Sequence, residues 1–140
     1  MTSQKVTINL EVVDVGKIDL LVAHGFYANR TDLVKHAVRN LLTDHSELIL
    51  RESTANPLEQ ELAGERTHVI RSMGVIRLSR RQLEELADQG KRLRLTTVGM
   101  LFFDPAISPE LADQTIEEIK AYGALKINPD VSERLGDRIR

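Results

Sequence analysis

The sequence predicts an α+β protein in two parts, and three patterns indicate this. The first is the alternation of apolar and polar residues in KVTINL at residues 5–10, which is typical of a strand with one buried face. The second is a pair of segments with helical periodicity that follows this strand. The third is a glycine-centred motif that occurs three times near the C-terminus. We therefore expect a domain at residues 1–45, a linker at 46–66 and a β/α repeat domain at 67–140.

The composition excludes several classes of protein. The chain has 140 residues, of which 41% are hydrophobic and 29% are charged, so a packed core is possible. It contains no cysteine, which excludes disulfides, thiolate metal sites and a cysteine nucleophile. No apolar run approaches the roughly 20 residues of a membrane-spanning helix. The N-terminal residues lack the apolar segment of a signal peptide, so we expect a cytoplasmic protein without a membrane partner.

Residues 5–10 are expected to form a strand with two different faces. The apolar face would hold Val6, Ile8 and Leu10. The hydrogen-bonding side chains of the opposite face would be Lys5, Thr7 and Asn9. By itself, this alternation favours a solvated strand face over a face that reads DNA.

Two helices are expected after the strand. Asp14 is suited to cap the first helix, and Gly25 is suited to follow its last turn. Asn29 and Asp32 resemble a capping box at the start of the second helix, whose apolar residues recur every four positions. One strand and two short helices cannot close a core. We therefore expect a dimer, with a two-stranded antiparallel ribbon packed on four helices.

The C-terminal part is expected to contain three parallel strands. Residues 46–66 are predicted to be a linker because Pro57 and Gly64 interrupt any long helix. The repeats that follow are centred on Gly74, Gly99 and Gly123, which lie 25 and 24 residues apart. Strands at even spacing, joined by helical segments, indicate a short solenoid of stacked parallel strands. A compact βαβ domain is the alternative.

A second motif at residues 25–42 connects the N-terminal part with a known family. It reads GFYANRTDLVKHAVRNLL, with a Gly-aromatic pair, a polar turn and a basic-x-Ala-aliphatic-Arg stretch. With the KVTINL strand, it resembles the ribbon-helix-helix DNA-binding proteins of the MetJ/Arc/CopG type. The resemblance covers about the first 45 residues and implies a homodimer whose paired strands enter the major groove of double-stranded DNA. The repeat region is similar, far more loosely, to small β-solenoid modules.

This resemblance implies roles for two groups of residues. The bases would be read by Lys5, Thr7 and Asn9. Their chemistry agrees, because lysine donates to guanine, asparagine pairs with adenine and threonine contacts several bases. The phosphates would be bound at the start of the second helix, where free amides and the helix dipole favour an anion. The residues at that position are Asn29, Arg30 and Thr31.

The remaining polar residues are not expected to form a catalytic or metal site. The four histidines lack the spacing of metal ligands, and adjacent Glu84 and Glu85 point apart on a helix. No nucleophile has a base nearby in the sequence, so we expect no enzymatic activity, no metal and no cofactor. The arginines between residues 71 and 81 are expected to form a solvated face, and contact with flanking DNA is the alternative.

The patterns together predict a sequence-specific transcriptional regulator, a repressor, that is a homodimer or a higher oligomer. Its C-terminal domain would join dimers or bind a protein partner or an effector. A second hypothesis is an antitoxin that regulates its own gene with the same DNA-binding end. A third is an assembly protein that polymerises through the solenoid and uses the N-terminal segment only to hold two chains together. The first 45 residues hold five basic and five acidic residues. Any DNA contact must therefore come from individually positioned groups and not from a general excess of positive charge.

Overall fold

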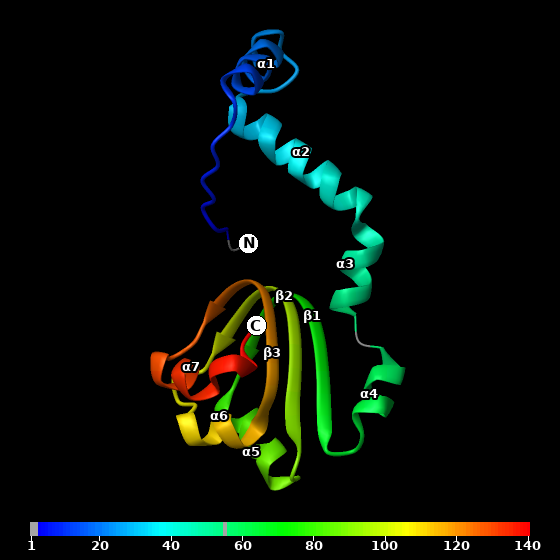
Figure 1. Ribbon diagram of the computed structural model, residues 1–140, viewed down its shortest axis with the longest axis vertical. Helices are drawn as coiled ribbons and strands as arrows, with labels where there is room; N and C mark the ends of the chain where they lie inside the picture. Colours follow the sequence, from blue (N-terminus) through cyan, green and yellow to red (C-terminus); the bar gives the residue numbers. More distant parts are fainter. Residues whose placement is uncertain (1–2, 55) are drawn as a thin grey trace. The chain divides into compact units, whose positions relative to one another are not determined.

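The computed structural model describes residues 3–54 and 56–140, and the chain divides into two units, Met1–Glu47 and Leu48–Arg140 (Figure 1). The first unit contains the helices α1 (Val12–Ala23) and α2 (Arg30–Asp44). The second unit contains a three-stranded sheet with its helices. The structure is therefore a mixed α/β arrangement.

The first predicted helix is present, but it begins earlier than its capping signal indicated. α1 starts at Val12, and Glu11 occupies the N-cap position without a side-chain hydrogen bond. The prediction that Asp14 caps this helix is wrong, because Asp14 lies in the first turn. Its carboxylate still interacts favourably there with the positive end of the helix dipole. Gly25 follows the helix as predicted, with a φ of 80°, and its amide bonds to the carbonyl of Val22.

The second predicted helix begins with the expected cap. The Oδ1 atom of Asn29 accepts a hydrogen bond from the amide of Asp32 at 2.8 Å. The carboxylate of Asp32 accepts in return from the amide of Ala28, at 3.1 Å, and not from that of Asn29. The capping box is therefore present in a form whose second bond is shifted by one residue.

Residues 3–11 lie in neither a helix nor a strand. The strand predicted for residues 5–10 is thus not formed within one chain. A strand needs a neighbour for its backbone hydrogen bonds, and the described residues of the first unit supply none. The ribbon predicted between two chains remains a prediction.

The segment predicted as a linker carries two short helices, α3 (Ser46–Ser53) and α4 (Pro57–Ala63). The interruptions fall where the sequence indicated them. Pro57 opens α4, and Gly64 follows it with a φ of 83°.

The three predicted strands are present and parallel. They are β1 (Thr67–Leu78), β2 (Arg92–Phe103) and β3 (Ile116–Lys126), in the order β1-β2-β3. The helices that alternate with them are α5 (Arg80–Asp88), α6 (Pro109–Thr115) and α7 (Pro129–Leu135), followed by a 3-10 turn, η1 (Gly136–Arg138). Figure 1 shows that each strand curves through its middle and that these helices lie on the concave side of the sheet.

The repeated glycines lie where the strands bend. Gly74, Gly99 and Gly123 are aligned across the sheet, and all three have positive φ. A Cβ atom on Gly99 would lie 2.1 Å from the carbonyl oxygen of Gly74, and one on Gly123 would lie 2.1 Å from that of Gly99. Because no side chain fits at such a distance, the bend requires glycine at these two positions.

The hydrophobic core belongs to the second unit. It lies between the concave face of the sheet and the helices, and its fully buried side chains include Leu83, Leu93, Leu95, Leu101, Ile107, Ile116, Ile119 and Val131. Each such side chain stabilises the fold by about 1.5–3 kcal/mol relative to an exposed one. This unit therefore has the core that a stable domain needs.

Candidate nucleic-acid interface

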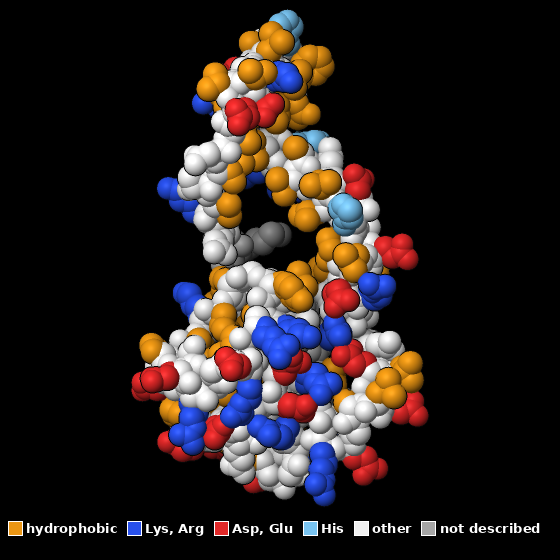
Figure 2. All heavy atoms as spheres, in the orientation of Figure 1, with side chains coloured by type: hydrophobic (Ala, Val, Ile, Leu, Met, Phe, Trp, Pro, Cys, Tyr) orange, Lys and Arg blue, Asp and Glu red, His pale blue; other side chains and the backbone are white. Residues whose placement is uncertain are grey.

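The first unit exposes its apolar side chains. Neither α1 nor α2 has a buried residue. The exposed large apolar side chains of these helices and the turn between them are Val12, Val13, Leu20, Leu21, Phe26, Val38, Leu41 and Leu42. In Figure 2, apolar side chains gather over this unit on the face in view. Exposed apolar surface of this extent marks an interaction site.

The proposed base-reading residues lie in the extended segment that precedes α1. Lys5, Thr7 and Asn9 are exposed, and their side chains make no hydrogen bond to any residue in the described part of the chain. The apolar residues between them are also exposed, with Val6 at 77% and Ile8 at 57%. Both faces of this segment are therefore free of intramolecular contacts that would occupy them.

Arg30, a proposed phosphate ligand, forms a two-pronged ion pair with Asp19 of α1. The distances are 2.7 Å from Nε to Oδ1 and 2.8 Å from Nη2 to Oδ2. The hydrogen bonds from Arg30 lower the pKa of the Asp19 carboxyl below its usual range, and they raise the pKa of Arg30. Both side chains are about half exposed, so solvent weakens the pair. A phosphate at Arg30 would compete with Asp19 for the guanidinium.

The other two proposed phosphate ligands lie beside Arg30 at the start of α2. The side-chain oxygen of Asn29 is occupied by the cap, whereas the backbone amides of Arg30 and Thr31 have no partner among the described residues. These amides are the groups of α2 that point toward an anion at the helix start. The carboxylate of Asp32, in the same turn, reduces the positive potential there. The structure thus brings the three residues together around backbone donors, not around a cluster of cations.

Sequence reasoning missed Asp19 as the partner of Arg30. The two residues are eleven positions apart and lie on different helices. The only signal in the sequence is that the two predicted helices carry opposite charges at these positions, and this signal is weak.

Two other kinds of feature are absent from residues 3–54 and 56–140. These residues contain no group of three or more histidine, aspartate and glutamate side chains that could hold a metal ion. Their helices include none that is long and apolar enough to cross a membrane.

The chain matches the model of the ribbon-helix-helix transcriptional regulator family over residues 1–132. No curated protein and no solved structure matches it. The family match extends into α7, so it includes the parallel sheet as well as the N-terminal helices.

Proposed function

Because the chain belongs to the ribbon-helix-helix transcriptional regulator family, we propose that it is a dimeric repressor that reads double-stranded DNA through a paired ribbon. The observation that carries this proposal is the absence of any buried residue on α1 and α2. A second copy of the unit is the partner that would cover these faces. Such a regulator acts on chromosomal DNA, which agrees with a cytoplasmic location.

The ribbon would form from residues 5–10 of the two chains. In an antiparallel pair, the alternation sets the two copies of Val6, Ile8 and Leu10 on one face, against the helices. The opposite face then presents Lys5, Thr7 and Asn9 of both chains to the major groove. A slip of one residue would exchange the two faces, so the apolar face specifies the register.

The phosphate contacts would come mainly from the start of α2. Its free amides at Arg30 and Thr31 bind an anion without requiring a basic surface. The balanced charge of the first 45 residues limits non-specific binding. We therefore propose that discrimination between DNA sequences depends on the ribbon. The C-terminal β/α repeats, a short solenoid, would join dimers on DNA or bind a protein partner.

The test is fluorescence anisotropy with DNA from upstream of the protein's own gene, over a salt series. Wild type is compared with the double variant Lys5→Ala/Asn9→Ala and with the control Lys17→Ala, an exposed lysine on α1. We expect the double variant to lose its preference over scrambled DNA but to retain weak, salt-sensitive binding, and the control to retain its preference. Equal preference in all three proteins would contradict base reading by the ribbon.

A further inference from the structure

The convex face of the sheet carries an exposed apolar stripe. Along each strand, the residues that face the core alternate with residues that face away from it. Next to the aligned glycines these outward residues are apolar, and Met73, Val75 and Tyr122 have exposed fractions of 58%, 57% and 56%. The apolar stripe consists of two rows across the three strands, Met73, Val98 and Tyr122 in one row and Val75, Met100 and Ala124 in the other. Exposed apolar surface of this extent marks an interaction site.

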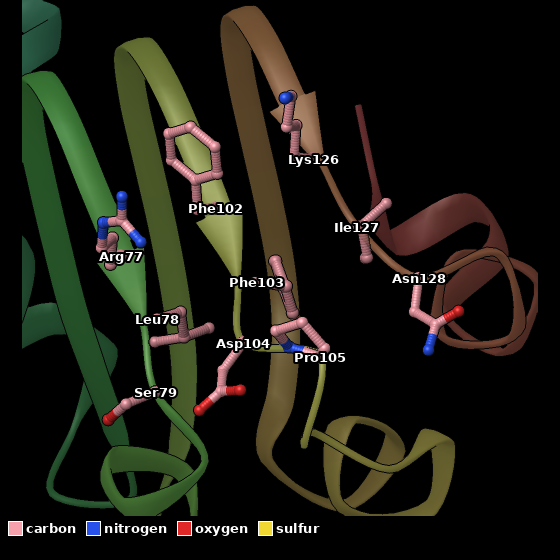
Figure 3. A pocket seen from close by; sticks show the side chains of 10 residues that line it. All are labelled: Arg77, Leu78, Ser79, Phe102, Phe103, Asp104, Pro105, Lys126, Ile127 and Asn128. Atoms are coloured by element: carbon pink, nitrogen blue, oxygen red, sulfur yellow. The ribbon is translucent and has the colours of Figure 1, made fainter.

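A row with two cations borders the apolar stripe on the side nearer the carboxyl ends of the strands. Arg77, Phe102 and Lys126 are aligned across the sheet, two residues after the second apolar row. Figure 3 shows the two cations on either side of the ring. The Cζ atom of Arg77 lies 4.9 Å from the ring centroid, and the Nζ atom of Lys126 lies 5.6 Å from it. The ring therefore fills the space between the cations, and both of these charged side chains are exposed at the margin of the stripe.

The two cations of this row are not neutralised within the chain. Arg71 and Arg94, which lie before the bend, are paired with glutamates at 2.6 and 2.7 Å. Within the described part of the chain, neither Arg77 nor Lys126 forms an ion pair. An apolar stripe beside cations without acidic partners is complementary to a surface that has both apolar and acidic side chains.

A second copy of the same face lacks this complementarity. Consider two-fold pairing of two sheets face to face, centred on the apolar stripe. If the strands of the two copies run in the same direction, β1 lies over β3, and Arg77 lies opposite Lys126 of the second copy. If the strands run in opposite directions, each strand lies over its own equivalent, and Lys126 lies opposite Lys120 of the second copy. Both arrangements set cations against cations, so the face fits an acidic partner better than it fits itself.

The dimensions of the apolar stripe match one helix. Its two rows are about 7 Å apart along the strands, and the outer strands are about 10 Å apart. A helix of about ten residues that lies across the strands would cover both rows with one apolar face. Acidic side chains on one flank of such a helix would then lie beside Arg77 and Lys126.

We propose that the convex face binds an amphipathic helix of another protein that carries carboxylates along one flank. The apolar side chains of this helix pack on the stripe, and its carboxylates pair with Arg77 and Lys126. The proposal gives the chemistry of the protein partner that the proposed function assigns to the C-terminal repeats, and it does not require DNA binding.

The test is the fluorescence anisotropy of a labelled synthetic helix of about 14 residues during titration with the full-length protein. Leucines form one face of this peptide and glutamates form its flanks, and the matched control peptide has glutamine in place of each glutamate. We expect saturable binding of the glutamate peptide and binding of the glutamine peptide that is about three- to tenfold weaker. Amide chemical shifts should change along the two apolar rows and at residues 77, 102 and 126.

A first pair of variants tests the apolar part of the face. Met73→Ser/Tyr122→Ser removes two exposed side chains of the stripe and should lose about tenfold or more in affinity for both peptides. The matched control is Leu62→Ser, which removes an exposed leucine of α4 instead. It should bind as wild type does.

A second pair of variants tests the charges. Arg77→Gln/Lys126→Gln should bind the two peptides with equal affinity, because the preference for glutamate comes from these cations. The matched control is Arg80→Gln/Arg81→Gln, which removes two exposed cations of α5 that are paired with Glu84 and Glu85. It should keep the wild-type preference for glutamate.

Four results would overturn the proposal. The first is equal binding of the two peptides to wild type, or no saturable binding of the glutamate peptide. The second is unchanged affinity in Met73→Ser/Tyr122→Ser. The third is dissociation of the oligomer by this variant in sedimentation, which would assign the face to a second copy. The fourth is a stronger response of the same amides to random duplex DNA or to anionic vesicles, which would assign the cations to phosphate. Because the peptide titration contains no DNA, failure of the repressor proposal would leave its result unaffected.

Discussion

The side chain of Gln60 pairs with the backbone of Val69 as a neighbouring strand would. Its Oε1 atom accepts a hydrogen bond from the Val69 amide at 2.8 Å, and its Nε2 atom donates to the carbonyl of Thr67 at 2.7 Å. β1 is an edge strand, so these backbone groups have no strand partner on that side. α4 thus closes the beginning of an edge at which another chain would otherwise add a strand.

The opposite edge is closed by the C-terminus. The Arg140 amide donates to the carbonyl of Ile119 at 2.8 Å, and the Ala121 amide donates to the carbonyl of Arg140 at 3.1 Å. Both edges are therefore covered at Thr67–Val69 and at Ile119–Ala121, which protects these parts of the sheet from pairing with another chain.

Replacement of Gln60 by alanine should destabilise the second unit by about 1–3 kcal/mol, because the amide of Val69 and the carbonyl of Thr67 lose their partner. Urea unfolding measures the free energy, and light scattering reports any aggregation through the opened edge. The variant Gln60→Glu keeps the acceptor for Val69 but loses the donor for Thr67, so it should be intermediate. Wild-type stability of Gln60→Ala would contradict a role for this pairing.

The glycine substitutions should differ in severity although all three residues have positive φ. Gly74→Ala meets no atom within 4 Å, so it should cost about 1–2 kcal/mol from backbone strain alone. Gly99→Ala places a Cβ atom against the backbone of Gly74 and should cost clearly more. Thermal unfolding measures the difference. Equal losses would show that strain, and not the close approach of the strands, requires glycine.

The ion pair between Glu59 and Arg71 should make the second unit sensitive to acid. Its hydrogen bonds lower the pKa of Glu59 below the ordinary value of 4.5, although burial opposes the shift. The stabilisation is therefore complete above the unfolded-state pKa and is lost as the pH falls through the lower folded-state pKa. The variant Glu59→Gln should lower the free energy of unfolding near pH 7 by about 1–3 kcal/mol.

The loss caused by Glu59→Gln should shrink as the pH falls below 4.5, since the wild-type carboxylate then becomes protonated as well. Urea unfolding at a series of pH values measures this. Some acid sensitivity should remain in the variant, because Arg94 lowers the pKa of Glu117 in the same way. A constant difference across the pH range would contradict the assignment.

A charge on the apolar face of the N-terminal segment should prevent dimerisation of the first unit. Ile8→Lys introduces an ammonium group where the ribbon would meet the helices, whereas Thr7→Lys introduces it on the opposite face. Sedimentation of the full-length proteins should show that the dimer of the Ile8→Lys variant dissociates at a higher protein concentration than the dimer of the Thr7→Lys variant. Equal dissociation would contradict the predicted register.

Release of Arg30 should strengthen non-specific DNA binding. Asp19→Asn removes the partner that occupies two of its N–H groups. We expect tighter binding at low salt and a steeper dependence on salt concentration, by about one further phosphate contact per chain. Asp44→Asn removes an equal charge from the far end of α2 and is the matched control. Identical salt dependence in the two variants would contradict a phosphate role for Arg30.

The sequence by itself determined the positions of the strands and of the glycine bends. The repeat of glycines at intervals of 25 and 24 residues is a local pattern, because it follows from the length of one β/α repeat. The cap at Asn29 was predictable for the same reason, since capping joins residues three apart. The false cap at Asp14 shows the limit of such signals, because a carboxylate is also favourable one turn further in.

Only the tertiary structure decided which distant groups meet. The pairing of Arg30 with Asp19 and the contact of Gln60 with Val69 depend on how helices pack, and no local pattern specifies this. Phe102 lies between two cations because parallel register brings Arg77 and Lys126 to either side of it from the neighbouring strands. Contacts of this kind depend on the alignment of whole elements, which is decided by burial of the shared core.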